Sequence, residues 1–136
     1  MPHITIEYSA NLENDIDIRA LVHRVHEAVL ASGVFEMGAV RTRAERRDLY
    51  EIADGDPTNG FIHVDLNMAP GRDVAARKRV AQATLDVVTE ATKSVFARSG
   101  LALSVEIHEI DNSTALRLNN LHARMAAKGG SRKAAS

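Results

Sequence analysis

The second residue of this chain is a proline, and its position could give it a chemical role. Pro2 follows Met1, and an initiator methionine is usually removed when the next side chain is small. Removal would leave Pro2 with a free secondary amine, and a terminal α-amino group has a pKa of about 8 in model peptides. From the dipeptide alone, a residue that merely follows the start site is the favoured interpretation. A chemical role requires that the rest of the chain hold Pro2 in place.

Arginine supplies the second set of side chains with possible chemistry. Arg41 and Arg43 are two residues apart on a predicted strand and therefore point to the same face. Arg72 precedes a predicted helix, whose N-terminus also attracts anions. Because guanidinium groups bind carboxylates in bidentate geometry, we expect Arg72 to bind an anion, with Arg41 or its rival Arg43 as a second contact. The other arginine-rich runs are interpreted as solvated charged surface: Arg46-Arg47 and Arg77-Lys78-Arg79.

Histidines occur in two spaced pairs. His3 and His63 take matching positions on two predicted strands, where they could contact a ligand or hydrogen-bond between strands, and we favour the second interpretation. His23 and His26 are three residues apart, a spacing that could hold a metal on a helix, but no further ligand cluster is visible in the sequence. The absence of cysteine excludes disulfides and thiolate metal sites. We expect no metal site and no cofactor.

Composition sets the class of protein. With 136 residues the chain is long enough for one compact domain, which we place at residues 1–127, and the glycine- and serine-containing segment 128–136 is expected to be disordered. A hydrophobic share of 45% and a charged share of 26% are typical of a soluble protein. The net charge of -1 and the aromatic share of 4% indicate no nucleic-acid or membrane partner. The amino terminus lacks a signal-peptide pattern, so we expect a cytoplasmic protein.

Hydrophobic periodicity predicts the elements that would position these residues. Strands are predicted around Ile4, Ile6 and Tyr8, over 61–68 and over 101–107, and an extended segment over 39–53. Helices are predicted from about residue 18 to 29, after a cap at Asp15 or Asp17, and from Asp73 to about residue 97. A short helix is predicted over about 116–127.

The two halves of this pattern resemble each other. His3-Ile4-Thr5-Ile6 aligns with His63-Val64-Asp65-Leu66 without a gap, and the loop-to-helix sections are expected to follow in step. Each half predicts a right-handed βαβ unit. The predicted fold class is therefore α+β, with a four-stranded sheet and both helices on one face. If the other face is apolar, something must cover it.

Short motifs along the chain resemble those of one enzyme family. The amino-terminal run is Pro2-His3-x-x-x-Glu7-Tyr8-Ser9-x-Asn11-Leu12. Later motifs are Val40-Arg41-x-Arg43, Ala53-Asp54-Gly55, Gly71-Arg72 and Asn119-Asn120-x-His122. In these motifs the chain resembles the 5-carboxymethyl-2-hydroxymuconate isomerases of the tautomerase superfamily, in register from Pro2 to about His122. Short members of that superfamily carry an arginine in the loop after their first strand, a position that is Leu12 in the first half of this chain and Arg72 in the second.

The resemblance implies a tautomerase-like fold and a cofactor-free isomerase of homoprotocatechuate catabolism that acts as a homotrimer on a small carboxylate dienol. It implies that Pro2 takes the proton from the 2-hydroxyl group and returns it to carbon, giving the conjugated 2-oxo acid. Arg72 and Arg41 would be the other catalytic groups, with Arg43 and His3 as further substrate contacts. Neither a cofactor nor a metal is implied.

Two alternatives stay open at this point. The first is another activity of the same superfamily, a keto–enol tautomerase or a dehalogenase-like enzyme with a different substrate. The second is a ligand-binding or assembly module without catalytic activity, in which Pro2 is incidental. The absorbance change of an added dienol separates an enzyme from such a module.

Overall fold

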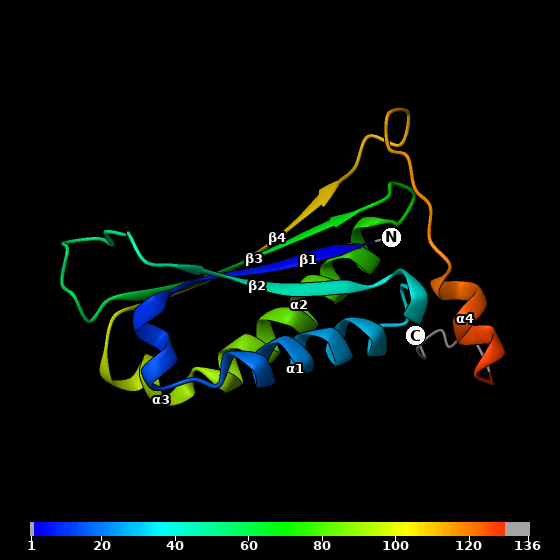
Figure 1. Ribbon diagram of the computed structural model, residues 1–136. Coiled ribbons are helices and arrows are strands. Elements are labelled where there is room, and N and C mark those ends of the chain that lie inside the picture. Colours follow the sequence, from blue (N-terminus) through cyan, green and yellow to red (C-terminus); the bar gives the residue numbers. More distant parts are fainter. Residues whose placement is uncertain (1, 130–136) are drawn as a thin grey trace.

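The computed structural model describes residues 2–129 and contains two strand–helix–strand units in succession (Figure 1). The first unit consists of β1 (His3–Ser9), α1 (Ile18–Ala31) and β2 (Arg41–Arg47). The second consists of β3 (Gly60–Met68), α2 (Val74–Ala91), α3 (Lys93–Arg98) and β4 (Leu101–Glu109). Shorter elements are the 3-10 helices η1 (Ala10–Asn14) and η2 (Met37–Ala39) and the terminal helix α4 (Leu121–Ala127).

The four strands form one mixed sheet in the order β2-β1-β3-β4. Strand β1 runs parallel to β2 and antiparallel to β3, and β3 runs parallel to β4. Helices α1, α2 and α3 lie together on one side of this sheet (Figure 1). The predicted α+β fold, with two βαβ units and helices on one face, is therefore confirmed.

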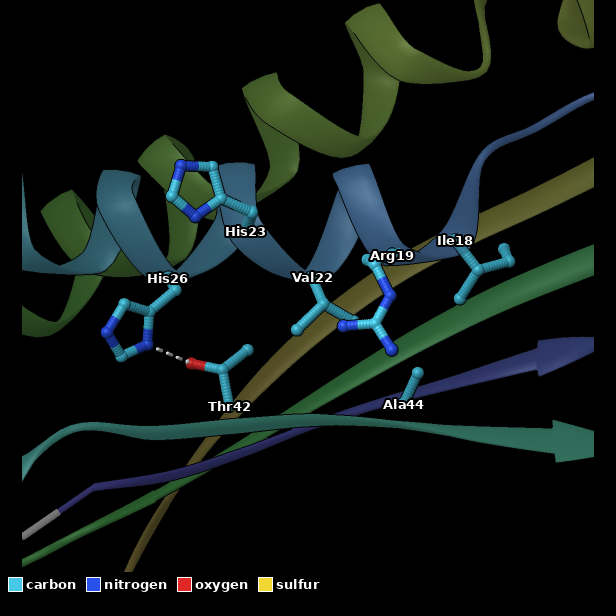
Figure 2. Close-up of a pocket in the computed structure, with 7 residues that line it drawn as sticks. All are labelled: Ile18, Arg19, Val22, His23, His26, Thr42 and Ala44. Atoms are coloured by element: carbon cyan, nitrogen blue, oxygen red, sulfur yellow. Dashed lines mark hydrogen bonds between the residues drawn. The ribbon is translucent and has the colours of Figure 1, made fainter.

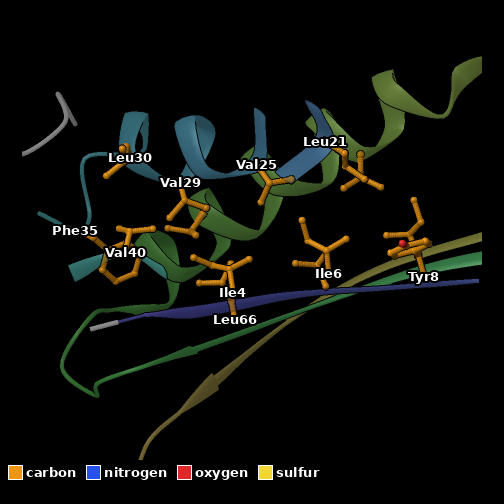
Figure 3. Close-up of a cluster of buried hydrophobic side chains, with 14 of the residues drawn as sticks. Ile4, Ile6, Tyr8, Leu21, Val25, Val29, Leu30, Phe35, Val40 and Leu66 are labelled. Atoms are coloured by element: carbon orange, nitrogen blue, oxygen red, sulfur yellow. The ribbon is translucent and has the colours of Figure 1, made fainter. Parts of the chain in front are cut away.

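The core fills the space between the sheet and the helices (Figure 3). Ile4 and Ile6 on β1 are fully buried, and helix α1 supplies Leu21, Val25 and Val29 from the opposite side. Strand β3 alternates in the same way, and its inward residues are Ile62, Val64, Leu66 and Met68. Full burial of an aliphatic side chain contributes about 1.5–3 kcal/mol. Burial of alternate residues therefore fixes which side chains of each strand point away from the helices.

The face of the sheet that points away from the helices, called here the open face, is polar. Its side chains include His3, Thr5 and Glu7 from β1 and Arg41 and Arg43 from β2. Strands β3 and β4 add further polar groups to it: His63, Asp65, Asn67, Ser104, Glu106 and His108. The expectation that an apolar second face must be covered therefore does not apply to this protein.

The structure corrects three predicted elements. Strand β2 ends at Arg47, and Leu49 in the following loop is 96% exposed because no apolar surface faces it. The long second helix breaks at Thr92, whose backbone leaves helical geometry with a φ of -107° and a ψ of 8°. Helix α4 begins at Leu121 instead of 116, where the Asn119 side chain accepts a hydrogen bond from the Leu121 N–H group.

The two loops that lead into the main helices do not follow in step. The capping aspartates Asp17 and Asp73 are 56 positions apart, whereas the aligned strand residues His3 and His63 are 60 apart. The difference is taken up by η1, which lengthens the first loop. Both aspartates cap their helices by accepting a hydrogen bond from the backbone N–H group three residues later.

The described residues end shortly after α4. Lys128 and Gly129 donate backbone hydrogen bonds to carbonyl groups of that helix, and the rest of the segment expected to be disordered, 130–136, lies outside the described residues. Within residues 2–129, none of the helices combines the length and apolar character needed to cross a membrane.

Candidate active site

Pro2 lies at the point where three strand ends meet. Its side chain is buried, and its carbonyl oxygen accepts a hydrogen bond of 3.2 Å from the Arg41 N–H group. The register pairs His3 with Arg41 of β2 and with Asn67 of β3. The start of β1 therefore lies beside the start of β2 and the end of β3, and all three lie at one end of the molecule (Figure 1). Whether Met1 is removed lies outside the described residues.

Arg72 reaches the same end of the molecule from the loop between β3 and α2. Its guanidinium carbon lies 4.9 Å from the centre of the Phe35 ring, a cation–π contact that fixes the direction of the side chain. One Nη atom donates to the Ala69 carbonyl at 3.3 Å. Because Phe35 is 1% exposed and belongs to the core, the contact holds Arg72 against a rigid surface. The remaining guanidinium donors are thus available to a ligand.

A small cavity of about 220 Å³ adjoins Arg72. Its other lining residues are Val34, Phe35, Glu36, Ala39 and His122. The carbonyl group of Ala39 accepts a hydrogen bond of 2.7 Å from the Arg41 guanidinium, which ties Arg41 to one of the lining residues. The structure therefore places Arg72 in the cavity lining and Arg41 one hydrogen bond away from it, whereas neither Arg41 nor Pro2 is among the lining residues.

Arg43 and His3 lie farther along the open face. The Arg43 guanidinium is exposed, and its Nη1 atom lies 3.0 Å from Nδ1 of His3. Burial lowers the pKa of His3, and the positive charges of Arg43 and Arg41 lower it further. A neutral His3 can accept a hydrogen bond from Arg43 through Nδ1. These two residues form a pair on the open face, and neither is a lining residue of the cavity.

Ion pairs separate the arginines of this region into two groups. Arg46 pairs with Glu13 and Asp48, and Arg47 pairs with Glu7 and Glu45, at distances between 2.6 and 2.8 Å. These exposed pairs explain the Arg46-Arg47 run, which the family resemblance leaves unassigned. Within residues 2–129, by contrast, no carboxylate lies at ion-pair distance from three others: Arg41, Arg43 and Arg72. An anionic ligand can therefore reach these three arginines without displacing a carboxylate of the described residues.

Two cavity residues were missed by sequence reasoning, Glu36 and His122. Helix α4 brings His122 against η2, and Nδ1 of His122 lies 3.5 Å from a carboxylate oxygen of Glu36. A Cβ atom added to Gly38 would lie only 2.9 Å from Nδ1 of His122, so this close approach requires glycine. The motif Asn119-Asn120-x-His122 includes His122, but the sequence does not show which residues His122 contacts.

Larger hollows lie elsewhere, along the two outer strands. One of about 650 Å³ lies between α1 and β2, where His26 Nδ1 lies 2.9 Å from the Thr42 hydroxyl (Figure 2). A second of about 540 Å³ lies between α2 and β4. Because the two hollows take equivalent places in the two βαβ units, we ascribe them to the way each helix crosses its outer strand. Neither contains Pro2, Arg41 or Arg72.

Comparison with known proteins identifies one family. The family described as 5-carboxymethyl-2-hydroxymuconate isomerase matches residues 2–125. A 5-carboxymethyl-2-hydroxymuconate Delta-isomerase from Escherichia coli is 28% identical over 123 residues, covering 90% of this chain and 98% of the relative. The crystal structure of a 5-carboxymethyl-2-hydroxymuconate isomerase from Deinococcus radiodurans R1 has 35% identity and a TM-score of 0.85, covering 90% of this chain and 92% of that chain.

Two further solved structures extend the comparison. A 5-carboxymethyl-2-hydroxymuconate delta-isomerase has 27% identity and a TM-score of 0.82, over 91% of this chain and 92% of that chain. A macrophage migration inhibitory factor-like protein from Entamoeba histolytica has 11% identity and a TM-score of 0.59, over 85% of this chain and 94% of that chain. At that identity the second likeness concerns the fold alone.

Proposed function

This chain belongs to the 5-carboxymethyl-2-hydroxymuconate isomerase family, and from that premise we propose how its residues perform the isomerisation. The substrate named by the family is a hydroxylated diene that carries carboxylate groups. In the reaction the proton of the 2-hydroxyl group leaves oxygen, a carbonyl group forms, and the double bonds shift. A proton is added to carbon at the far end of the conjugated system. Electrons and atoms balance within the substrate, so this proton transfer needs a base and anion-binding groups.

Pro2 is the proposed base. After removal of Met1 its secondary amine would stand at the start of β1, where the backbone hydrogen bond to Arg41 holds it. An α-amino group has a pKa of about 8, and nearby guanidinium charges favour its neutral form. The neutral amine accepts the hydroxyl proton and then delivers it to carbon. Positioned proton transfer of this kind contributes about 10²–10⁴-fold to the rate.

Arg72 and Arg41 are the proposed anion-binding groups. The observation that carries this proposal is that Arg72 lines the cavity, that Arg41 donates to the carbonyl of the lining residue Ala39, and that neither arginine pairs with a carboxylate in the described part of the chain. They would hold the substrate carboxylates so that the 2-hydroxyl group lies beside Pro2. Arg72 or Arg41 would also stabilise negative charge that gathers on oxygen in the transition state. Arg43 and His3, which form a pair on the open face, would contact a further part of the substrate.

A comparison of Arg41→Ala with Arg43→Ala tests this arrangement. We expect Arg41→Ala to lower kcat/KM by about tenfold or more, because a charge-assisted hydrogen bond is lost at the cavity. Arg43→Ala should have a smaller effect. The measurement is the ultraviolet absorbance change of 5-carboxymethyl-2-hydroxymuconate, with wild-type protein alongside. Equal rates for wild type and Arg41→Ala would contradict the assignment of Arg41, and an absent wild-type reaction would contradict the proposed function itself.

We also propose that residues 1–127 form one domain and that three such chains assemble into a homotrimer. The assembly follows from the resemblance, since the polar open face does not demand cover. Strands β2 and β4 are both edge strands without a further partner in residues 2–129, which leaves backbone groups available to neighbouring chains. Light scattering during size exclusion tests the assembly, and an active monomer of 14.8 kDa at micromolar concentration would contradict it.

A further inference from the structure

A cluster of histidine and carboxylate side chains lies on the open face, on β3 and β4. His63 and Asp65 are two residues apart on β3, and Glu106 lies on β4 directly opposite Asp65. The ligand atoms of these three residues all lie within 4.8 Å of one another. His63 Nε2 is 3.2 Å from Asp65 Oδ1 and 3.5 Å from Glu106 Oε2. None of the three belongs to the proposed anion-binding groups.

The two separations from His63 are close to those between neighbouring ligands of one metal ion. Zinc bonds to histidine nitrogen and carboxylate oxygen measure about 2.0–2.2 Å, so neighbouring ligands of a tetrahedral ion are about 3.3–3.6 Å apart. The two distances from His63 to Asp65 and Glu106 lie within about 0.1 Å of that range. The residue types also fit, because imidazole together with carboxylate suits divalent first-row transition metals. Three ligands from the chain leave a fourth position for water.

Two further side chains hold the ligands in this orientation. Nδ1 of His63 lies 2.6 Å from the Ser104 hydroxyl, and donation from Nδ1 to that oxygen leaves Nε2 unprotonated and directed at the carboxylates. Nε2 of His108 lies 3.2 Å from the same Asp65 oxygen and 3.6 Å from Glu106. Hydrogen bonds of this kind, from outside the ligand set, orient metal ligands in many proteins.

We propose that His63, Asp65 and Glu106 bind one divalent transition-metal cation on the open face, with Ser104 and His108 as positioning residues. Two carboxylates and a neutral imidazole give the site a net negative charge, which a divalent cation compensates. The alternative occupant is a proton on His63, which would bridge the same carboxylates as an ordinary ion pair. The two occupants differ in what they predict for metal binding.

Zinc is the probe for the test. Full-length chain without an affinity tag, in its native assembly, is stripped with a chelator and titrated with Zn²⁺ in competition with a chromogenic chelator. We expect one Zn²⁺ per chain. His63→Gln and Asp65→Asn should each abolish this binding, and Ser104→Ala and His108→Gln should weaken it by about 10–100-fold. His23→Gln is the matched control, because that histidine is exposed on α1 and lies away from the cluster.

Two readouts keep the test independent of folding defects. Circular dichroism checks that each variant keeps the sheet, and Zn²⁺ should raise the melting temperature of wild type but not that of His63→Gln. Nitrogen-15 spectra of the histidine rings should show a zinc-induced shift at Nε2 of His63 and none at His23. Failure of wild type to retain zinc against a micromolar chelator, or equal binding by His63→Gln, would overturn the proposal. In either case the isomerase assay described above is unaffected and reports separately on the proposed function.

Discussion

The two βαβ halves of this protein place a histidine at the same point of their first strand but surround it with opposite charge. In the first half His3 pairs in register with Arg41, and its ring nitrogen contacts Arg43. In the second half the equivalent His63 pairs with Ser104 and contacts carboxylates. Cationic groups therefore surround one histidine and anionic groups surround the other.

This difference arises only at outward positions. The inward residues of β1 and β3 are apolar and fully or almost fully buried in both halves, because each strand packs on the same helix layer. Outward side chains make no contribution to that core, so they can differ in charge without changing the register of the sheet. A repeated backbone thus provides two surfaces, one suited to anions and one suited to cations.

Replacement of Pro2 should have the largest effect, because the proposed base occurs in the first half only. We expect Pro2→Ala to keep its fold and to lower the isomerisation rate at least about tenfold, because positioned proton transfer contributes about 10²–10⁴-fold and the variant retains a weaker base. The primary amine of alanine accounts for residual activity. The measurement is the dienol absorbance, with intact mass to establish that Met1 is absent from both proteins. Full activity in a protein that retains Met1 would remove Pro2 from the mechanism.

Leu12 and Arg72 take equivalent loop positions after the first strands of the two halves. Substitutions at these two positions therefore test the comparison between the halves. Leu12 is 3% exposed and belongs to the core. We expect Leu12→Ala to lower the free energy of unfolding by about 2–4 kcal/mol, through lost burial and a residual cavity. Its kcat/KM at a temperature where it is folded should stay near that of wild type. Urea denaturation measures the first quantity, and a loss of activity without a loss of stability would contradict the structural role.

Arg72→Ala should show the reverse pattern. We expect a loss of about tenfold to a hundredfold in kcat/KM, as removal of a hydrogen bond to a charged group costs about 1.5–3 kcal/mol. The melting temperature should change little, since Arg72 forms no ion pair with a described residue. Arg24→Ala is the control, because Arg24 is an exposed residue of α1. Arg77 is less suitable, because it is half-buried and lies 3.8 Å from Glu109. Equal activity of Arg72→Ala and Arg24→Ala would place the anion site elsewhere.

The smallest expected effect is a change in the pH dependence of stability, and it concerns the hollow between α1 and β2. His26 lines this hollow at the position that Gln82 takes in the hollow between α2 and β4. Burial is the main cause that lowers the pKa of His26 from its ordinary value of 6.5. The unfolded chain therefore binds more protons as the pH falls through about 6.5, and this contribution to stability is present above that pH and lost below it. We expect His26→Gln to reduce the loss of stability between about pH 7.5 and pH 5.5.

Urea unfolding at the two pH values measures this change in both proteins. Part of the slope should persist in the variant, because the pKa of His3 is lowered as well. An unchanged slope in His26→Gln would show that His26 titrates alike in the folded and unfolded chains.

The sequence predicts the regular strands well because their inward residues alternate. Ile4, Ile6 and Tyr8 mark β1 directly, and the apolar alternation of β3 does the same. The break at Thr92 could not be predicted, because Thr84 makes the same hydroxyl-to-carbonyl hydrogen bond inside the unbroken helix and the apolar periodicity continues across both threonines. The extended segment predicted around β2 was too long because it included Leu49, which is apolar but exposed. Apolar character alone does not establish burial.

The candidate site was only partly accessible to sequence reasoning. Arg72 could be selected from its place before a helix, but its contact with Phe35 joins segments far apart in the chain. The charge partners of Arg46 also depend on tertiary structure, as Glu13 belongs to η1. On the open face, the spacings His63-x-Asp65 and Glu106-x-His108 are visible in the sequence. Only the parallel register of β3 and β4 brings them together.

The charges of the two sheet edges have a consequence for symmetry. Strand β2 carries four arginines and one glutamate, whereas β4 carries glutamates at 106 and 109 and no arginine or lysine. A two-fold axis that joined β2 to a second β2 would place arginines opposite arginines, which is destabilising. Contact between the β2 edge of one chain and the β4 edge of the next would set opposite charges together. Such a heterologous contact generates a closed ring when its rotation closes, so the edges favour cyclic assembly over a two-fold dimer.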